Sequence, residues 1–298
     1  MKKINFLVIT VLLAAFATSM SAAEIKAVRN GSKIDVTVDN LFFTSYHFSL
    51  EEKFPFFYPV NGPVTNGSVT SMRNGDYPHH SSLYIGCDLV NGGNYWYDTP
   101  EKGQIVSKGA TIVEQGDRVV ITDECVWQRP GAESPLKDTR KITITAPSKE
   151  LRQIDFDITI ETLTDVVILK NNHSLFSGRV AADISVTNGG VMINAEGAKS
   201  ESETFGKPSA WIDYYGKRGN TIEGIAILQH PSNIGFPFPW FTRDYGFFSP
   251  TPFYWPENGA NFNFRKGEKT TLRYRVLIHT GDHKAADIAG QFEKYKNN

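Results

Sequence analysis

Cysteine and surplus charge are both scarce in this sequence. Only Cys87 and Cys125 occur among its 298 residues, so the chain has no disulfide framework. The formal net charge is −1, which leaves no basic footprint for nucleic acid. After residue 23, no uncharged apolar segment approaches the ~20 residues that span a bilayer. We therefore expect no nucleic-acid partner and no membrane insertion of the mature chain, and the two thiols either pair or lie buried separately.

The sequence also lacks the short motifs that identify several enzyme classes. It contains no GxSxG nucleophile elbow, no phosphate-binding loop and no dinucleotide fingerprint. The metal-binding spacings HxH, HExxH and CxxC are absent as well. We therefore expect no cofactor. One alternative stays open, a divalent metal held by His173, His230 and one histidine of the His79-His80 pair.

The N-terminus has the layout of a secretory signal peptide. Lys2 and Lys3 precede an apolar run from Phe6 to Phe16, and small residues follow at 21–23. A charged start, a short apolar run and a small-residue exit are typical of a segment that is removed on export. We predict a signal peptide over residues 1–23 and a periplasmic or secreted mature protein.

The rest of the chain is patterned as β-strands. Asn30-Gly31 lies between two alternating runs, a strong hairpin signal. Isoleucines at every second position, as at Ile142 and Ile144, indicate strands with one buried face. Residues 179–188 read as further β-structure, two prolines argue against a central strand at 54–59, and only 284–296 has helical spacing. We predict an all-β fold, a single antiparallel sandwich domain over residues 24–298 with a short C-terminal helix.

The stretch from Gly224 to Phe253 begins as a strand and continues as a segment that we interpret as a rigid loop. The segment carries polar and aromatic side chains between prolines: His230, Asn233, Trp240, Arg243, Asp244 and Tyr245. Such side chains on a loop beside a sheet are typical of a site for a small polar ligand, above all a sugar. Trp240 is expected to stack on the ligand or to fill the core, and Arg243 to clamp an anionic or hydroxyl group.

His79-His80 lies on a loop rich in glycine and proline and is expected to form the other wall of this cleft. Imidazole titrates near neutral pH, so either histidine is a candidate general acid or base. The alternative is one exposed histidine and one that is held by structural hydrogen bonds. Trp211 and Asp213, two residues apart, are expected to share one face of a strand. Paired carboxylates for glycoside hydrolysis have to lie close in space, which residue spacing does not show.

Several blocks of the sequence, among them DYPHHSSLYIG, LFSGRVAAD, GIAILQHPSN and PWFTRDYGFFSPTPF, resemble an exported bacterial family labelled "methane oxygenase PmoA". The resemblance runs from about Phe54 to Asp282 in the family's order. It carries over at these positions: His79, His80, Arg179, Trp211, Asp213, His230, Asn233, Trp240, Arg243 and Tyr245. The chain departs at Ser81-Ser82, where the family usually has Arg-Gly, and at 251–254, where it usually has Asn-Pro-Phe-Gly.

The label itself is not expected to describe the activity. The membrane subunit that it refers to consists largely of transmembrane helices, and this chain has the alternation of a soluble sheet protein. We therefore expect no methane oxygenase activity. The resemblance implies instead a role beside exported proteins that degrade glycans.

A second resemblance concerns the fold. The run FPFFYPVNGPVTNG, followed by a histidine before a strand, is similar to the opening of galactose-mutarotase-like proteins. That resemblance implies a β-supersandwich with a sugar site on its concave face. Pro63 stands where those proteins have an arginine, so their mechanism does not transfer.

Three functional hypotheses follow. The first is a carbohydrate-active enzyme, a lyase, hydrolase or epimerase, in which His79, His80, His230, Arg243 and Tyr245 act on a glycoside. In this hypothesis the substrate contacts are Arg179, Trp211, Asp213, Asn233 and Trp240. The second is a glycan-binding protein without catalysis that uses the same loops. The third is a metal-dependent variant of the same site.

Overall fold

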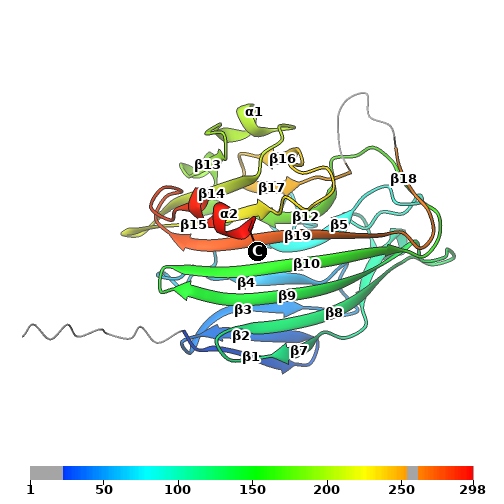
Figure 1. Ribbon diagram of the computed structural model, residues 1–298, viewed down its shortest axis with the longest axis horizontal. Coiled ribbons are helices and arrows are strands. Elements are labelled where there is room, and N and C mark those ends of the chain that lie inside the picture. Colours follow the sequence, from blue (N-terminus) through cyan, green and yellow to red (C-terminus); the bar gives the residue numbers. More distant parts are fainter. Residues whose placement is uncertain (1–22, 254–260, 298) are drawn as a thin grey trace, which may run out of the picture.

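The computed structural model describes residues 23–253 and 261–297, so the predicted signal peptide lies outside the described residues except for Ala23. Two large antiparallel sheets pack face to face (Figure 1). The first sheet has eight strands in the order β1 (Ile25–Asn30), β2 (Lys33–Val38), β3 (Leu41–His47), β4 (Phe56–Val60), β5 (Leu83–Cys87), β12 (Ser174–Arg179), β17 (Phe247–Pro250) and β16 (Trp240–Arg243).

The second sheet is the larger one. Its nine strands are β13 (Val191–Asn194), β14 (Trp211–Arg218), β15 (Thr221–Gln229), β19 (Lys269–Thr280), β10 (Leu151–Thr162), β9 (Leu136–Ser148), β8 (Val119–Gln128), β6 (Gln104–Ser107) and β7 (Thr111–Glu114), which pairs with β8. A separate pair joins β11 (Val166–Ile168) to β18 (Phe262–Phe264). The helices are α1 (Ser200–Thr204), α2 (Ile288–Tyr295) and the 3-10 turns Pro100–Lys102, Ala182–Ile184 and Val186–Asn188.

Alternation of apolar side chains builds the core between the sheets. An aromatic run crosses it: Phe57 of β4 contacts Phe156 of β10, which packs on Phe176 of β12, which stacks on Tyr274 of β19. All four rings are buried. Burying a side chain of this size stabilises the fold by roughly 1.5–3 kcal/mol, so the packing of these rings helps to hold the two sheets together. The predicted all-β antiparallel fold is confirmed.

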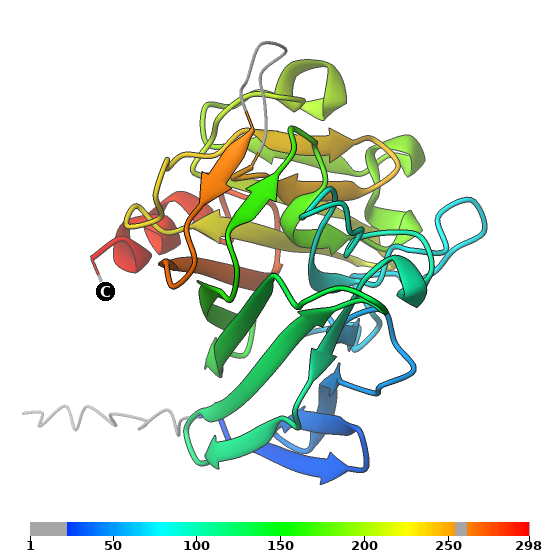
Figure 2. The same ribbon diagram turned by 90° about the vertical axis from the view of Figure 1, so that its right-hand side faces the viewer.

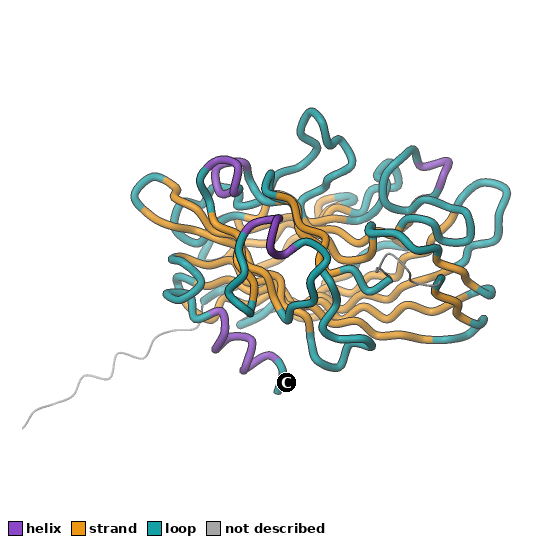
Figure 3. Tube along the Cα trace, turned by 90° about the horizontal axis from the view of Figure 1, so that it is seen from above, coloured by secondary structure: helices purple, strands orange, loops and turns teal. Residues whose placement is uncertain are grey.

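Different elements cover the two outer faces of the sandwich. Helix α2 lies on the outer face of the second sheet, where Ile288 and Tyr295 pack in a cluster with Trp211 and Leu277 (Figure 1). Long loops lie on the opposite side of the strands (Figure 3). The predicted C-terminal helix is confirmed, although it is shorter than residues 284–296 because Asp287 caps it by accepting the N–H of Gly290. No helix among the described residues is long and apolar enough to cross a membrane.

Two expectations for the first half of the chain were wrong or left open. Residues 56–60 form β4, an internal strand between β3 and β5, despite Pro59. The prediction failed because Tyr58 and Pro59 together face only Ser45, in a register shift of β3 against β4, so the missing N–H leaves no gap in a regular ladder. Cys87 and Cys125 are free and buried, one in each sheet, so the alternative of separate thiols holds.

Three expectations for the second half also need correction. Residues 182–188 form two 3-10 turns rather than further β-structure. The segment that we interpreted as a loop contains the hairpin of β16 and β17, in which Trp240 faces Pro250 and Arg243 faces Phe247. The five-residue helix α1 adds a second helix, which its serines and glutamates do not signal because it has no apolar stripe.

Candidate functional site

The floor of the candidate site is the outer face of the first sheet. Arg179 of β12 lies directly opposite Phe247 of β17, and both side chains lie on the face that is turned away from the second sheet. Their neighbours Phe176 and Phe248 point inward, since Phe176 stacks on Tyr274 and Phe248 contacts a tyrosine of the second sheet. The strand period of two therefore delivers an arginine and an aromatic ring side by side to the outer face.

One wall is the loop that enters β5. It is closed by a bridge between Met72 and Ser81 and by the Arg73 N–H, which donates to the carbonyl of His80 at 2.7 Å. His80 is buried and stacks on Tyr77, with ring centroids 5.0 Å apart, and on Phe247 at 4.6 Å. His79 lies edge-on to His80 at 4.4 Å and is only half-buried. The loop thus turns one histidine inward and leaves the other accessible.

The residue at the end of this loop, Ser82, has a backbone conformation that is uncommon for serine. Ser82 has a φ of 61°, in the left-handed region that favours glycine. The Ser82 hydroxyl donates to Thr70 Oγ1 at 2.7 Å, a buried contact that offsets part of the backbone strain.

The second wall is the segment that follows β5. Asn94 Oδ1 accepts the N–H groups of both Trp96 and Tyr97 at 3.0 Å, which fixes the turn. Trp96 is buried and stacks on His173 at 5.2 Å, whereas Tyr97 is 40% exposed and lies 5.8 Å from the same imidazole. Figure 2 shows the cyan loops around β5 together on one side of the molecule. His173 immediately precedes β12, so it joins this wall to the floor.

A cavity of about 440 Å³ lies between the two walls, and its lining includes His79, Trp96, Tyr97, Arg73, Lys53 and Asp98. Its volume is within the range of ~300–1,000 Å³ that is typical of small-molecule sites. Lys53 is held at its side by two carbonyls, those of Asn94 and Thr99, at 2.9 and 2.8 Å. Burial lowers the pKa of Lys53 to about 8, against the opposing charges of Asp98 and its acidic neighbours. The cavity therefore combines aromatic surface with ionisable groups.

The protonation states in and beside the cavity are set by burial and by neighbouring charges. Burial, and then the charge of His173, lower the pKa of His79 below its ordinary value. Burial together with His79, Arg179 and His173 lowers the pKa of His80 to about 2. The charge of Asp88, and then burial, raise the pKa of Tyr97. At neutral pH the site therefore presents neutral imidazoles, which can accept a proton, and a protonated phenol, which can donate one.

Arg179 does not line this cavity but lies in a stack of aromatic rings that includes Tyr77, the ring on which His80 stacks. Its guanidinium sits 4.4 Å from the ring of Tyr245 and 5.3 Å from that of Tyr77, and the two rings stack on each other at 4.4 Å. The residue is 5% exposed, and burial lowers its pKa. Burial and the neighbouring Tyr77 raise the pKa of Tyr245, which is therefore protonated at neutral pH. The structure thus brings together four of the predicted site residues, His79, His80, Arg179 and Tyr245.

Arg243 lies at the margin of this cluster and is already engaged. Its guanidinium stacks over Phe205 at 4.6 Å and Phe241 at 4.4 Å, and its Nη1 pairs with Glu201 Oε1 at 2.9 Å. Asp244 accepts the N–H of Glu201 at 2.7 Å, which ties α1 to the β16–β17 turn. The predicted clamp therefore holds a protein carboxylate.

The structure does not bring the other predicted residues to the cluster. Asp213 is buried on the outer face of the second sheet and contacts His279 Nε2 at 2.9 Å. Trp211 packs in the cluster under α2 on that same face. Asn233 exchanges two hydrogen bonds with the backbone of Arg273, which is a structural role.

The last two predicted residues have structural surroundings as well. His230 Nδ1 contacts Ser232 Oγ at 2.7 Å, and its ring meets Tyr295 of α2 edge-on at 5.0 Å. Trp240 is fully buried, and its Nε1 donates to the carbonyl of Ser209 at 2.8 Å. Of the two alternatives for this tryptophan, the core residue is the one that the structure shows.

The residues that sequence reasoning did not assign to a sugar site are Trp96, Tyr97 and Asp88. Trp96 and Tyr97 were recognisable only as an aromatic pair after a glycine turn. Asp88 Oδ2 lies 3.8 Å from Nδ1 of His173, the histidine that was considered only as a metal ligand. No spacing rule links these residues, because the pairing of β5 with β12 brings them together.

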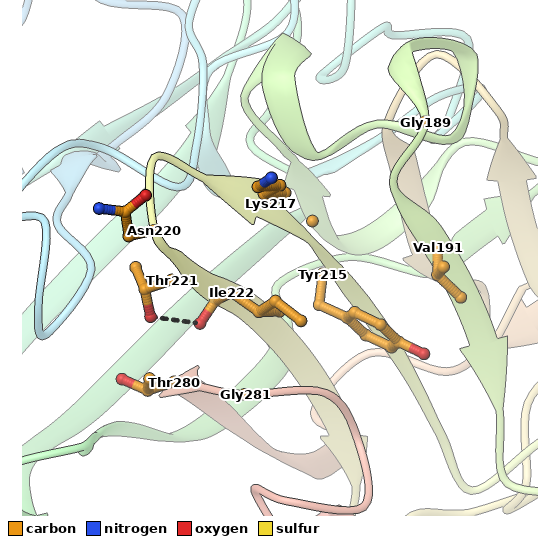
Figure 4. Close-up of a pocket in the computed structure, with 10 residues that line it drawn as sticks. Gly189, Val191, Tyr215, Lys217, Asn220, Thr221, Ile222, Thr280 and Gly281 are labelled. Atoms are coloured by element: carbon orange, nitrogen blue, oxygen red, sulfur yellow. Dashed lines mark hydrogen bonds between the residues drawn. The ribbon is translucent and has the colours of Figure 1, made fainter.

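Across residues 23–253 and 261–297, no group of three or more His, Cys, Asp or Glu side chains is arranged to hold a metal ion. Another cavity, of about 560 Å³, lies at the edge of the second sheet and is lined by Tyr215, Lys217, Thr221 and neighbouring residues (Figure 4). Its lining contains no histidine and no carboxylate. The His79 cavity is therefore the better candidate for acid–base chemistry.

The solved structures that match this chain include three distant likenesses. A protein assigned as a kojibiose phosphorylase from the human microbiome matches with a TM-score of 0.36 and 8% identity over 91% of this chain and 33% of that one. A polysaccharide lyase matches with a TM-score of 0.33 and 12% sequence identity, over 89% of this chain and 33% of the lyase chain. A galactose mutarotase related enzyme from Lactobacillus acidophilus matches with a TM-score of 0.28 and 8% sequence identity, over 86% of this chain and 97% of the enzyme's chain. This chain thus spans about a third of the first two.

The family comparison is more extensive. A search of the curated proteins finds none that matches this chain. The resemblance to the family labelled "methane oxygenase PmoA" stays a prediction, because that label does not occur in these comparisons. One family model matches residues 33–293, which is most of the sequence. The chain therefore belongs to the family described as "Family of unknown function (DUF6807)".

Proposed function

We propose that this protein is an exported carbohydrate-active enzyme that cleaves or isomerises a glycoside by proton transfer in the His79 cavity. One observation carries the proposal: a neutral imidazole, His79, and a protonated phenol, Tyr97, line the same cavity beside Trp96. The ring centroids of His79 and Tyr97 are 6.1 Å apart. Because both side chains line one cavity, a sugar bound in that cavity would contact both groups.

The two groups have complementary roles in this proposal. His79 accepts a proton, from a ring carbon in an elimination or epimerisation, or from a water molecule in a hydrolysis. In an elimination, the electron pair of the broken C–H bond forms a C=C bond while the glycosidic C–O bond breaks, and Tyr97 protonates the leaving oxygen. A positioned acid or base of this kind typically contributes about 10²–10⁴-fold to the rate.

The buried groups behind His79 support it rather than contact the substrate. His80 stacks between Tyr77 and Phe247 and is neutral, so it holds its neighbour without adding a positive charge. His173 stands between Trp96, on which it stacks, and Asp88, whose Oδ2 lies 3.8 Å from its Nδ1. The burial of His80 favours His79 as the base among the two histidines that the sequence nominated.

A glycan-binding protein without catalysis is the second candidate. The exposed ring of Tyr97, beside the cavity, favours it, because an aromatic face packs well on the apolar face of a sugar. In that case Tyr97→Ala removes affinity and no substrate yields product. A metal-dependent variant would contain stoichiometric metal after purification and lose activity on chelation.

The deciding experiment is incubation of the mature protein with a panel of plant and algal oligosaccharides, followed by mass spectrometry. We expect products from the wild type, a loss of about 100-fold or more in His79→Asn, and oligosaccharide affinity that changes only a few-fold. His283→Asn is the matched control, because His283 lies beside Tyr215 on the other side of the sandwich and should leave the rate unchanged. Affinity without product supports the glycan-binding protein. The absence of both affinity and product would contradict both candidates.

A further inference from the structure

Arg179 differs from the other buried arginines in its hydrogen bonding. Four arginines of the described chain are buried, and three of them are satisfied by the protein. Those three make the following contacts: Arg140 with Asp138 at 2.6 and 3.2 Å, Arg275 with Asp155 at 2.7 and 2.8 Å, and Arg152 with the carbonyls of Asn61 and Gly62 at 3.0 and 3.3 Å. The fourth is Arg179, whose Nε and Nη1 are buried without a hydrogen-bond partner.

The surroundings of Arg179 supply no negative charge. The groups that act most on its charge are four tyrosines, Tyr245, Tyr77, Tyr214 and Tyr84. No carboxylate within the described residues forms an ion pair with it, and the nearby His80 is neutral. A second buried group in the same stack, His80 Nδ1, also lacks a partner. Leaving buried donors unpaired is costly, so these atoms point to a group that the protein itself does not provide.

The neighbouring cations do not share this property. Arg243 pairs with Glu201, Arg73 pairs with Glu52, and Lys53 donates to two carbonyls. Among the lysines and arginines of residues 23–253 and 261–297, only Arg179 has buried nitrogen atoms without a hydrogen-bond partner, Nε and Nη1. The guanidinium fork matches the two oxygens of a carboxylate or sulfate, which it can bind bidentately.

We propose that the sugar handled at this site carries an anionic oxygen group, a uronate carboxylate or a sulfate ester, and that Arg179 binds it. This inference rests on the proposed function and names the substrate class for it. Tyr77 and Tyr245 are partly exposed whereas the guanidinium is buried, so the two rings cover it. Tyr77 belongs to a loop whose residues 73–76 and 78 are exposed, and binding of the anionic group displaces this ring from Arg179.

The test measures binding by calorimetry with matched pairs of oligosaccharides. One pair is oligogalacturonides and their methyl esters, a second is alginate oligosaccharides and their methyl esters, and a third is sulfated galactan oligosaccharides and their desulfated forms. We expect at least one charged member to bind 10-fold or more tightly than its uncharged partner, with an advantage that declines in added salt. Binding of the carboxylates alone, or of the sulfates alone, identifies which anionic group the site takes.

Variants then assign the anion to its arginine. Arg179→Met should abolish the preference for the charged member, while the surface control Arg118→Met should retain it. If the uncharged members bind as tightly as the charged ones, the inference is wrong and the proposed function stands. If Arg243→Met abolishes the preference and Arg179→Met does not, Arg179 is not the anion site. If no oligosaccharide binds, the proposed function fails as well.

Discussion

Replacing Arg179 by methionine should stabilise the unliganded protein, the opposite of what most core substitutions do. Two buried N–H groups lose no partner, since Nε and Nη1 have none, and each unsatisfied donor costs about 1–3 kcal/mol. Methionine keeps most of the apolar stem. The loss is the cation–π contact with Tyr245 and Tyr77, roughly 1–2 kcal/mol. With mid-range values, about 4 kcal/mol regained from the two donors and about 1.5 kcal/mol lost from the cation–π contact, the free energy of unfolding rises by roughly 2–3 kcal/mol.

Chemical denaturation and thermal melting measure this gain. At a rise of roughly 2–4 °C per kcal/mol for a chain of this size, Arg179→Met should melt at least about 4 °C higher than the wild type. Arg140→Met is the matched control, because it leaves the buried Asp138 without its counter-charge and should lose about 3–5 kcal/mol. If Arg179→Met is destabilised as strongly as Arg140→Met, then Arg179 has a structural role and the reasoning about its unused donors is refuted.

Three further predictions concern groups on both sides of the sandwich. Because the pKa of His80 is about 2 in the fold and ordinarily 6.5, the free energy of unfolding should fall as pH drops below 6.5, by up to ~1.4 kcal/mol per pH unit. In His80→Leu, denaturation should show a weaker dependence of this free energy on pH. Burial opposes the charge of His279, yet Asp213 raises its pKa, so this pair stabilises below pH 6.5 and its contribution is lost as pH rises through the higher pKa. Asp213→Asn should therefore lose more stability at pH 6 than at pH 9, whereas an equal loss at both would contradict the pairing. Trp240→Ala should cost about 3–5 kcal/mol in denaturation, and Tyr97→Ala should lower oligosaccharide affinity at unchanged stability; the reverse pattern would overturn their placement.

The fold was predictable where strands have one buried face. In β9 and β10 the isoleucines alternate with polar residues, and this pattern gives both the strand and its orientation. In β16 and β17 both faces are largely buried, so apolar residues such as Trp240 and Phe241 follow each other without alternating with polar ones. The hairpin was therefore taken for a loop. Residue pattern identifies a strand only when solvent contacts one of its faces.

The site was predictable in part for a similar reason. The histidine pair stood out because two imidazoles in a loop have few structural uses, and the structure places them beside Arg179 and Tyr245. The sequence could not show that Trp211, Asp213 and His230 lie on or near the other sheet. Which strands share a sheet depends on pairings between distant residues, such as Cys87 with Ser174. The residues next to each strand in the sequence do not show which distant strand it pairs with.

The pH dependence of kcat/KM on the best substrate of the panel tests the central claim most directly, because it reports the acid and the base of the free enzyme. The rate should fall on the acidic side at a pKa below the ordinary 6.5 of histidine and on the alkaline side at a pKa above the ordinary 10.0 of tyrosine. His79→Asn should remove the acidic limb and Tyr97→Phe the alkaline limb, each with a large loss of rate. Retention of both limbs and of the wild-type rate in these two variants would contradict proton transfer in the His79 cavity.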